Sequence, residues 1–400
     1  MRIAIVTPDY PPDPIGGAGI SCRLLVDQLR QRGQQVDVYA LTGATGEMEG
    51  LPGPEGADVR LPRPRSLLMR NALAAGFLRR TALHYDVVHI YEASLLPAGR
   101  MIRGLLRQRV PVVATLNNLR AACFAPELAL RDECDCGSIL GSLGAVFANP
   151  EPSSRLRGVL YVWPTFHVAR RISRGLTQYI ALSEDTRQQY VRAGFDEKRV
   201  AVIPNMYDPE HFGPRERQEP SGKPLRVLCV GQIDHRKGVL DLVRAFGQLP
   251  ERLRGETELA FLGRGKEEAA LRGLAAERGI EDRVQVRHVP YQELPTEYER
   301  AHVAAMPARW PEPFGRNKLE AMAFSLPIVT SDHGSAREVL GDAALYHAPH
   351  DVDDLAAKLG RLLRDADLRR ELGEAGRKRL AAYEPERIVP RMMELYGQLI

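Results

Sequence analysis

The sequence predicts an α/β protein of two doubly wound, Rossmann-like domains that face each other across a cleft. Short apolar, β-branched runs alternate with amphipathic helical patterns along most of the 400 residues, which is typical of parallel sheets with helices on both faces. The alternation stops at residues 204–224, where prolines, glycines and charged residues form a linker. It then restarts in the same way, with a strand, a polar glycine turn and a helix.

Each expected strand is a short apolar run bounded by turn residues. In the first half these runs are 3–6, 36–40, 86–90, 110–116, 177–181 and 200–203. In the second half they are 225–230, 258–262, 284–286, 303–306, 328–331 and 343–347. Helical periodicity between them is clearest at 20–31, 186–193, 266–278 and 351–363.

The restart of the pattern divides the chain into a first domain, 1–205, and a second domain, 206–382. The last stretch, 383–400, carries one apolar helical face formed by Ile388, Met392, Leu395 and Leu399. We expect this helix to cross back onto the first domain; the alternative is a plain terminal helix of the second. In doubly wound sheets, ligands bind at the carboxyl ends of the strands, so we expect the site in the cleft between the domains.

The composition excludes several classes of protein. Apolar residues make up 44% and charged residues 26% of the chain, which argues against a disordered chain or a coiled coil. No apolar run approaches the ~20 residues of a membrane-spanning helix. The first apolar stretch, 3–6, is too short for a signal peptide, so we expect a cytoplasmic protein.

Positive charge is concentrated in the first half. Residues 60–109 contain ten arginines and two acids, and residues 155–174 contain five arginines and no acid. Such a field suits an anionic acceptor or peripheral contact with the inner face of an anionic membrane. Tyr161, Trp163 and Phe166 beside Arg170 and Arg171 fit an interfacial helix. The alternative is a solvated arginine surface, and we expect no nucleic-acid partner.

The most informative segment is 307–323. A strand leads into a proline-rich turn that ends at Gly315, and good helix formers follow. The free amides of such a helix start favour a phosphate or diphosphate, and Arg316 and Lys318 add positive charge there. Glu320 lies one turn into the helix and suits paired hydroxyls such as those of a ribose, while Glu312 precedes the turn. The alternative is two surface glutamates around an ordinary turn.

Glu312 and Glu320 resemble the E-x7-E signature of family 4 glycosyltransferases, which have the GT-B fold. The resemblance covers nearly the whole chain, because further family motifs occur in order. They are a glycine loop at 8–19, two mid-domain strands at 86–89 and 111–116, and an "S…iPNg.D" stretch at 180–208. A "vGr…KG" loop at 230–238 and a "G.G" turn at 262–265 follow.

The resemblance implies a role for each matching position. Glu320 would hold the nucleotide ribose, Glu312 would contact the transferred sugar, and Lys237 with Arg236 would stabilise the leaving diphosphate. The other implied donor contacts are the helix start at Gly315, Arg316, Asn317 and Lys318, the loops at Gly231, Gln232 and Gly263, and the base-reading backbone at His288 and Val289. Gly16 and Gly17 would lie beside donor or acceptor.

The resemblance also implies the reaction. A sugar passes from a nucleoside-diphosphate donor, a UDP-, GDP- or ADP-sugar, to a hydroxyl acceptor that is a glycan, a lipid-linked molecule or a small molecule. The family retains the anomeric configuration, for which same-face attack is the usual proposal. We expect no metal cofactor, because lysine, arginine and helix amides supply the positive charge.

Two departures keep an alternative open. Family members often carry a histidine where Asn117 follows the strand 111–116, and Gln232 replaces the first arginine of the "vGr" loop. Asn117 forms hydrogen bonds to a sugar hydroxyl but cannot titrate near pH 7. The alternative is therefore a nucleotide-sugar-binding protein with impaired turnover. A dinucleotide oxidoreductase is disfavoured because neither opening strand leads into G-x-G-x-x-G.

Two features of the first domain have open interpretations. Cys123, Cys134 and Cys136 are either part of a metal site or free thiols, and Cys-x-Cys is not the usual zinc spacing. His89 is expected at a strand end, either near the cleft or packed in the core.

Overall fold

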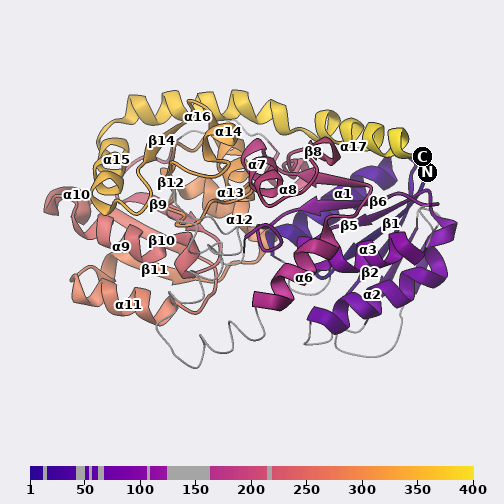
Figure 1. The fold of residues 1–400 in the computed structure, drawn as a ribbon. Helices are drawn as coiled ribbons and strands as arrows, with labels where there is room; N and C mark the ends of the chain where they lie inside the picture. Colours follow the sequence, from indigo (N-terminus) through magenta and orange to yellow (C-terminus); the bar gives the residue numbers. More distant parts are fainter. Residues whose placement is uncertain are drawn as a thin grey trace. The chain divides into compact units, whose positions relative to one another are not determined.

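The computed structural model describes residues 1–11, 16–41, 50–53, 56–61, 67–105, 109–123, 163–213 and 219–400. The chain forms two compact units, shown in Figure 1. The N-terminal unit comprises Met1–Met206 and Pro385–Ile400, and the C-terminal unit comprises Tyr207–Glu384.

The N-terminal unit contains an eight-stranded sheet with the order β3-β4-β2-β1-β5-β6-β7-β8. Its strands are β1 (Arg2–Thr7), β2 (Gln35–Ala40), β3 (Gly50–Gly53), β4 (Gly56–Arg60), β5 (Val87–Ile90), β6 (Val112–Leu116), β7 (Gln178–Ala181) and β8 (Val200–Val202). All neighbours pair in parallel except β3 and β4, which pair antiparallel.

Helices cover both faces of this sheet. They are α1 (Gly17–Gln31), α2 (Leu67–Thr81), α3 (Leu96–Leu105), α6 (Trp163–Ser173), α7 (Glu184–Arg192) and α17 (Pro385–Leu399). Side chains alternate along β1, so Ile3 and Ile5 pack with α1 and α17, whereas Ala4 and Val6 face the core beneath α2 and α3. Both faces are therefore apolar, as expected for a parallel sheet.

The C-terminal unit contains a six-stranded parallel sheet with the order β11-β10-β9-β12-β13-β14. Its strands are β9 (Leu225–Val230), β10 (Thr257–Leu262), β11 (Val284–Arg287), β12 (Val303–Met306), β13 (Ile328–Ser331) and β14 (Ala344–His347). Its helices are α8 (Pro209–Phe212), α9 (Val239–Gly247), α10 (Glu251–Gly255), α11 (Glu268–Glu277), α12 (Leu294–Arg300), α13 (Arg316–Ala323), α14 (Ala336–Leu340), α15 (Val352–Arg364) and α16 (Ala366–Leu380). The strand order reverses between β9 and β12, which makes their carboxyl ends the expected ligand position.

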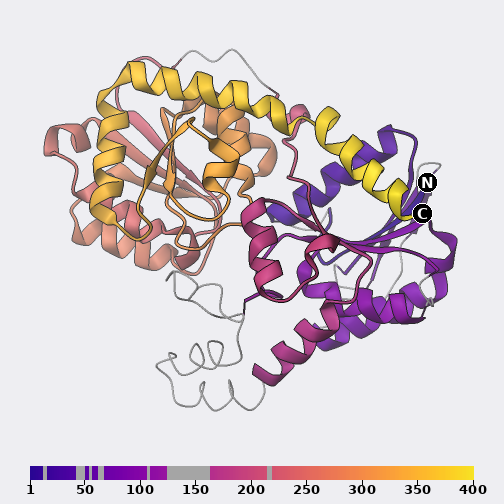
Figure 2. The same ribbon diagram turned by 45° about the horizontal axis from the view of Figure 1, so that its top comes forward.

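The last helix, α17, packs in the N-terminal unit, beside α1 (Figure 2). Ile388, Met392 and Tyr396 are buried in the core that α1 also lines, and Leu395 and Leu399 pack partly buried against it. The Arg391 guanidinium donates to the carbonyl of Val202 (2.7 Å), so polar contacts hold the same helix.

The predicted fold class of two Rossmann-like α/β domains is confirmed, and every expected strand is present with ends that move by at most two residues. Strands β3 and β4 were not predicted, because Gly50–Gly53 and Gly56–Arg60 have glycine-rich sequences without a β-branched run. The placement of the domains across a cleft stays a prediction. No described helix has the length and apolar character needed to span a membrane.

Candidate donor-binding site

The candidate site lies in the C-terminal unit, where the loops after β9 and β12 meet. Their strands are neighbours at the reversal of the strand order. A pocket there is lined by residues from both loops and from the start of α13, among them Gly231, Gln232, Lys237, Glu312 and Asn317. The structure thus brings together five residues that the sequence analysis assigned to the donor.

The loop after β9 delivers Lys237 to this pocket. A short 3-10 turn, His235–Lys237, ends at Gly238, whose φ of 66° is left-handed and favours glycine. A Cβ atom at Gly238 would lie 1.9 Å from the carbonyl oxygen of Pro307, so the loops after β9 and β12 touch there. Only glycine permits this approach, which fixes Lys237 beside the loop that carries Glu312.

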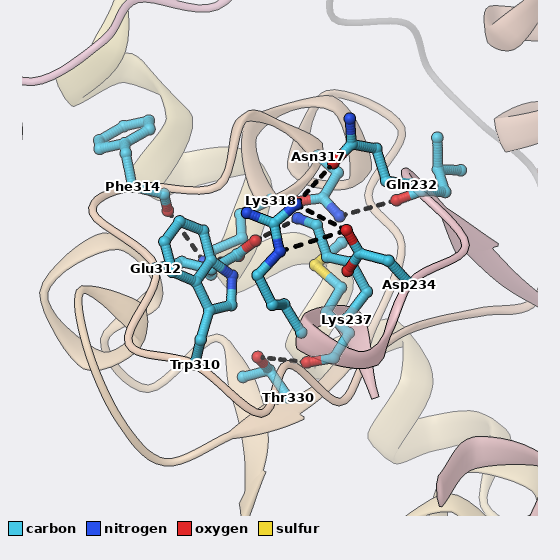
Figure 3. A network of polar contacts seen from close by, with 12 residues as sticks. Gln232, Asp234, Lys237, Trp310, Glu312, Phe314, Asn317, Lys318 and Thr330 are labelled. Carbon is cyan, nitrogen blue, oxygen red and sulfur yellow. Dashed lines mark hydrogen bonds and ion pairs between the residues drawn. The ribbon is translucent and has the colours of Figure 1, made fainter. Parts of the chain in front are cut away.

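Glu312 lies between two lysines, as Figure 3 shows. Its carboxylate forms an ion pair with the Nζ atom of Lys237 and a second one, at 3.2 Å, with the Nζ atom of Lys318. Burial disfavours the ionised carboxylate, but the two ammonium groups outweigh it and lower the pKa of Glu312. Glu312 is therefore an anion held in place rather than a proton donor.

Lys318 corrects a prediction. We expected its ammonium at the mouth of the phosphate site, but the residue is only 2% exposed. Its Nζ donates to the carbonyl of Phe314 (2.8 Å) as well as to Glu312, so Lys318 fastens the turn from inside. Its backbone amide donates to the carbonyl of Gly315 (3.1 Å), which removes it from the free amides of the helix start.

Gly315 is the N-cap of α13 and has a φ of 79°. A Cβ atom there would lie 2.3 Å from Lys318 Nζ and 2.6 Å from Glu312 Oε2, so a side chain would break the lysine–glutamate contact. The amides of Arg316 and Asn317 follow in the first turn, where helix geometry provides no partner within the helix. This helix start can bind an anion.

Glu320 is directed inward, onto α12. The hydroxyl of Tyr298 donates to Glu320 Oε2 (2.9 Å), and both residues are buried. Burial raises the pKa of Glu320, although Arg316 and Tyr298 oppose the shift. The carboxylate is thus held at a defined position, with one oxygen engaged by the tyrosine.

Arg316 also differs from its predicted place at the phosphate mouth. Its side chain is 8% exposed, and its guanidinium donates to the hydroxyl of Tyr291 (3.0 Å) and lies 3.9 Å from Glu320 Oε1. Burial lowers the pKa of Arg316, but Tyr291 and Glu320 outweigh this effect and the net shift is upward. One helical turn of spacing places Arg316 against Glu320 rather than against the mouth.

Arg236 lies on the exposed side of the pocket. Its guanidinium pairs with Asp234 (2.6 Å), donates to the side-chain oxygen of Gln232 (3.0 Å) and lies 5.4 Å from the centroid of the Trp310 ring. Gln232 and Asp234 therefore both orient the guanidinium of Arg236. The Trp310 ring and the Asp234 carboxylate hold the positive charge of Arg236 near Lys237.

The sequence did not predict the hydrogen bonds that hold the turn 310–314, which contains Glu312. The loop 333–335, after β13, contacts the turn 310–314 at three points. His333 Nε2 lies 2.7 Å from the carbonyl oxygen of Trp310. The Ser335 hydroxyl donates to the carbonyl of Phe314 (3.0 Å), and the Ser335 amide donates to the carbonyl of Glu312 (3.2 Å). No local sequence pattern indicated these contacts, because they join loops that follow different strands.

A second missed contact is the bidentate pair of Arg309 and Asp241. Arg309 Nε and Nη2 lie 2.5 Å and 3.0 Å from the two carboxylate oxygens of Asp241, in the first turn of α9. The amide of Arg309 also donates to the carbonyl of Arg236 (2.7 Å). The loops after β9 and β12 are therefore joined through the backbone at Arg236 and Arg309, and the Arg309 side chain also binds the start of α9.

Asn317 faces the pocket from the first turn of α13. Its amide nitrogen donates to the carbonyl of Val230 (3.0 Å), whereas its buried oxygen has no hydrogen-bond partner among the described residues. A buried amide oxygen without a partner is costly, so a donor from a ligand would satisfy it.

The remaining donor residues lie around this centre. Gly263 touches Gly231, because a Cβ atom at Gly263 would lie 1.8 Å from the Gly231 carbonyl oxygen. His288 and Val289 follow the edge strand β11, which β10 separates from β9. His288 is exposed and Val289 is half-buried. Their assignment to the base stays a prediction.

In the N-terminal unit, Gly16 and Gly17 are exposed at the start of α1. Asn117 follows β6 and is half-buried; its side chain contacts the amide of Ala93 and the carbonyl of Tyr91, each at 3.4 Å. These glycines and Asn117 keep their predicted roles as proposals.

His89 is packed in the core, the second of the two positions considered for it in the sequence analysis. The residue is fully buried, and its ring nitrogens contact the hydroxyls of Tyr396 (2.6 Å) and Thr115 (2.8 Å). Burial lowers the pKa of His89 to about 3, so the ring is neutral at physiological pH. We remove it from the candidate site.

Two groups bear on metal binding. Cys123 is buried and forms no disulfide with another described cysteine, while Cys134 and Cys136 lie outside the described residues. Among the described residues, Asp208, Glu210 and His211 come close enough to share a cation. Asp208 Oδ2 lies 3.0 Å from His211 Nδ1, and Asp208 accepts from the Tyr291 hydroxyl (3.2 Å).

Comparison with known proteins identifies the class. The family model of glycosyl transferases group 1 matches residues 214–379, and that of glycosyltransferase family 4 matches residues 15–211. The chain is 33% identical to the MMP alpha-(1->4)-mannosyltransferase of Mycolicibacterium hassiacum, over 95% of this chain and 93% of that protein. It is 32% identical to a glycogen synthase of Mycobacterium tuberculosis, over 96% and 91%.

Solved structures show the same fold. Sucrose-phosphate synthase from Thermosynechococcus elongatus gives a TM-score of 0.75 at 22% identity, over 100% of this chain and 98% of that one. Anabaena HepE in complex with UDP-glucose gives 0.72 at 17% identity, over the full length of both. The protein is therefore a glycosyltransferase with the GT-B fold. It belongs to glycosyltransferase family 4, with a C-terminal domain of glycosyl transferases group 1.

Proposed function

We propose that this glycosyltransferase moves a sugar from a nucleoside-diphosphate sugar to a hydroxyl acceptor with retention of the anomeric configuration. The C-terminal unit binds the donor, and the N-terminal unit with α17 binds the acceptor. The acceptor is a glycan, a lipid-linked molecule or a small molecule. The proposed location is cytoplasmic, at the inner face of a membrane, where the arginines of the N-terminal unit face anionic groups.

The observation that carries the proposal is the setting of Glu312 and Lys237 beside the start of α13. Lys237 and the amides of Arg316 and Asn317 supply the positive potential that a diphosphate requires. Glu320, held by Tyr298, supplies an acceptor for ribose hydroxyls. An anion site between two carboxylates fits a nucleotide sugar, which has hydroxyls on both sides of its diphosphate.

In the proposed reaction, the bond between the anomeric carbon and the diphosphate oxygen breaks, and the oxygen keeps the electron pair. The acceptor oxygen forms the new bond on the same face and transfers its proton to a phosphate oxygen. Lys237 and Arg236 stabilise the charge that develops on the diphosphate. The catalytic contribution of the chain is charge stabilisation and alignment, so no metal is invoked.

Donor binding would change the partner of Lys237. The Lys237 side chain is 25% exposed, and its ammonium pairs with the carboxylate of Glu312, whose side chain is 8% exposed. A diphosphate offers the ammonium more negative charge, and Glu312 stays ionised because Lys318 still pairs with it. Glu312 is then available to accept from the hydroxyls of the transferred sugar.

Calorimetry with UDP-, GDP- and ADP-sugars tests the donor class, and nuclear magnetic resonance of the product tests retention. We expect one donor family to bind and to raise the thermal midpoint by mass action. Inversion at the anomeric carbon would reject the same-face mechanism. Binding of a donor without release of nucleoside diphosphate across a panel of acceptors would favour the alternative, a sugar-nucleotide-binding protein.

A further inference from the structure

Exposed apolar side chains gather on one group of helices in the N-terminal unit. In the part of the chain that the structure describes, Met69, Met101, Val168 and Ile172 are large apolar residues with 60%, 47%, 59% and 39% exposure. They belong to α2, α3 and α6. Leu83, also 60% exposed, follows α2 directly. Single exposed apolar residues need no explanation, but several on adjacent helices indicate a binding surface.

The three helices are neighbours. Helix α3 contacts both α2 and α6, and Figure 1 shows the three helices close together. A groove between α3 and α6 is lined by Arg100, Met101, Gly104, Arg171 and Ile172. The opposite face of α3 is in the core, where Ile102 is fully buried. The outward face therefore combines arginines with apolar residues.

The three helices carry charge of one sign. The sequences of α2, α3 and α6 contain seven arginines and no aspartate or glutamate. Arg100 and Arg171 are exposed, whereas Arg170 is buried. Burial together with Arg199 and Arg100 lowers the pKa of Arg103, and burial together with Arg171 lowers that of Arg174. The arginines crowd one another, so an anionic partner would relieve their repulsion.

We propose that the outward faces of α3 and α6, continued by α2, dock on an anionic lipid bilayer. This inference rests on the proposed function, because it brings the enzyme to a surface that holds lipid-linked acceptors. Arginines would contact lipid phosphates, and Met101, Val168 and Ile172 would enter the region between headgroups and acyl chains. Nucleic acid offers phosphates for the arginines but no apolar layer for Met101, Val168 and Ile172. A bilayer can contact both kinds of side chain, so we favour the bilayer.

The surface also revises the expected interfacial helix. From the sequence we considered an interfacial helix with Tyr161, Trp163 and Phe166 beside Arg170 and Arg171, against a solvated arginine surface. Tyr161 lies outside the described residues. In α6, Arg170 is 7% exposed and lies 5.4 Å from the centroid of the Phe166 ring, so it is part of the fold. The outward residues are Val168, Arg171 and Ile172.

Co-sedimentation of the full chain with vesicles tests the proposal. The probes are phosphatidylcholine vesicles and vesicles in which about one third of the lipid is phosphatidylglycerol. We expect binding to the anionic vesicles, weaker binding at higher salt, and little binding to phosphatidylcholine alone. Equal binding to both vesicles, or no binding to either, would overturn the proposal.

Two double variants locate the surface. Arg100→Gln with Arg171→Gln should weaken vesicle binding roughly 25-fold, because each basic residue near an anionic bilayer contributes about fivefold. Met101→Gln with Ile172→Gln should weaken binding roughly tenfold by removing apolar insertion. Their controls are Arg252→Gln, at a side chain that is 90% exposed on α10, and Ile400→Gln, at a residue 64% exposed at the C-terminus. Wild-type binding in both double variants would overturn the proposal.

Three further outcomes separate this proposal from others. A variant that loses vesicle binding while it binds donor normally supports the surface. If the wild type binds vesicles but no nucleotide sugar, the proposed function fails and the surface stands. If a DNA duplex binds more tightly than the anionic vesicles and the arginine variants abolish that binding, the surface is a nucleic-acid site and the proposal is wrong.

Discussion

The hydroxyl of Tyr298 donates a 2.9 Å hydrogen bond to the carboxylate of Glu320, and both residues are buried. The Tyr298 ring stacks on Phe324, with centroids 5.7 Å apart and an interplanar angle of 11°. A tyrosine fixed by stacking and bonded to one oxygen of a buried carboxylate holds that carboxylate in a single orientation. We therefore regard Tyr298 as a positioning residue for the ribose contact that we propose for Glu320.

The first prediction concerns Tyr298→Phe. The variant keeps the ring and removes one hydrogen bond to a charged group, so donor affinity should fall roughly tenfold. Calorimetry with whichever of the UDP-, GDP- and ADP-sugars binds the wild type measures this loss. Tyr346→Phe is the control, because it removes a hydrogen bond to the carbonyl of Gly341, away from the pocket. Equal donor affinity in Tyr298→Phe and wild type would contradict the positioning role.

The same variant should change the pH dependence of donor binding. Burial raises the pKa of Glu320, and the Tyr298 hydrogen bond opposes that shift. The ionised carboxylate accepts from ribose hydroxyls, so affinity is present above the pKa of Glu320 and is lost as pH falls through it. Removing the hydrogen bond should move this loss to higher pH. Affinity measured from about pH 4 to pH 8 tests the direction.

The second prediction is that Lys318 serves stability more than donor binding. Lys318→Met leaves the buried Glu312 with one ion-pair partner and removes the bond to the Phe314 carbonyl. Breaking a buried pair in this way costs about 3 kcal/mol of unfolding free energy. Urea unfolding followed by circular dichroism measures it. A stability within 0.5 kcal/mol of wild type, the usual range of a surface substitution, would show that the turn does not depend on Lys318.

The third prediction concerns Lys237→Met, in which turnover should fall more than stability. This variant also leaves Glu312 with one ion-pair partner, but the Lys237 side chain is 25% exposed and that of Lys318 is 3% exposed, so Lys237→Met should cost less unfolding free energy than Lys318→Met. Turnover should fall about a hundredfold or more, because the leaving diphosphate loses a positive charge. Steady-state release of nucleoside diphosphate measures this effect. If Lys237→Met turns over normally, the proposed stabilisation of the leaving group is wrong.

The contrast between the two lysines illustrates what sequence could provide. Motif order placed Lys237, Glu312 and Gly315 in one site, and the structure brings them together because their loops follow neighbouring strands. The spacing did not show that Lys318 turns inward, since its direction depends on the buried Glu312 and Phe314 carbonyl. The contact between Tyr298 and Glu320 depends on how α12 packs on α13. Such contacts arise from tertiary packing, which local patterns do not encode.

The fourth prediction concerns the glycine between the two loops of the site. Gly238→Ala places a Cβ atom 1.9 Å from the Pro307 carbonyl oxygen, in a backbone with a φ of 66°. Gly279 is a matched control in the same unit, with a φ of 62° and no atom within 4 Å of the added Cβ. Gly279→Ala therefore reports the left-handed backbone alone, which costs about 1 kcal/mol.

The difference between the two variants isolates the contact of the loops. Gly238→Ala should cost at least 2 kcal/mol more than Gly279→Ala, since backbone must move to relieve the overlap. Because the movement separates Lys237 from Glu312, donor affinity should fall in Gly238→Ala and stay unchanged in Gly279→Ala. Urea unfolding and donor calorimetry on both variants measure the two effects. Equal stability losses in the two variants would mean that Gly238 and the Pro307 carbonyl are not in close contact, although the added Cβ lies 1.9 Å from that oxygen. In that case the contact between the loops would not be what holds Lys237 beside Glu312.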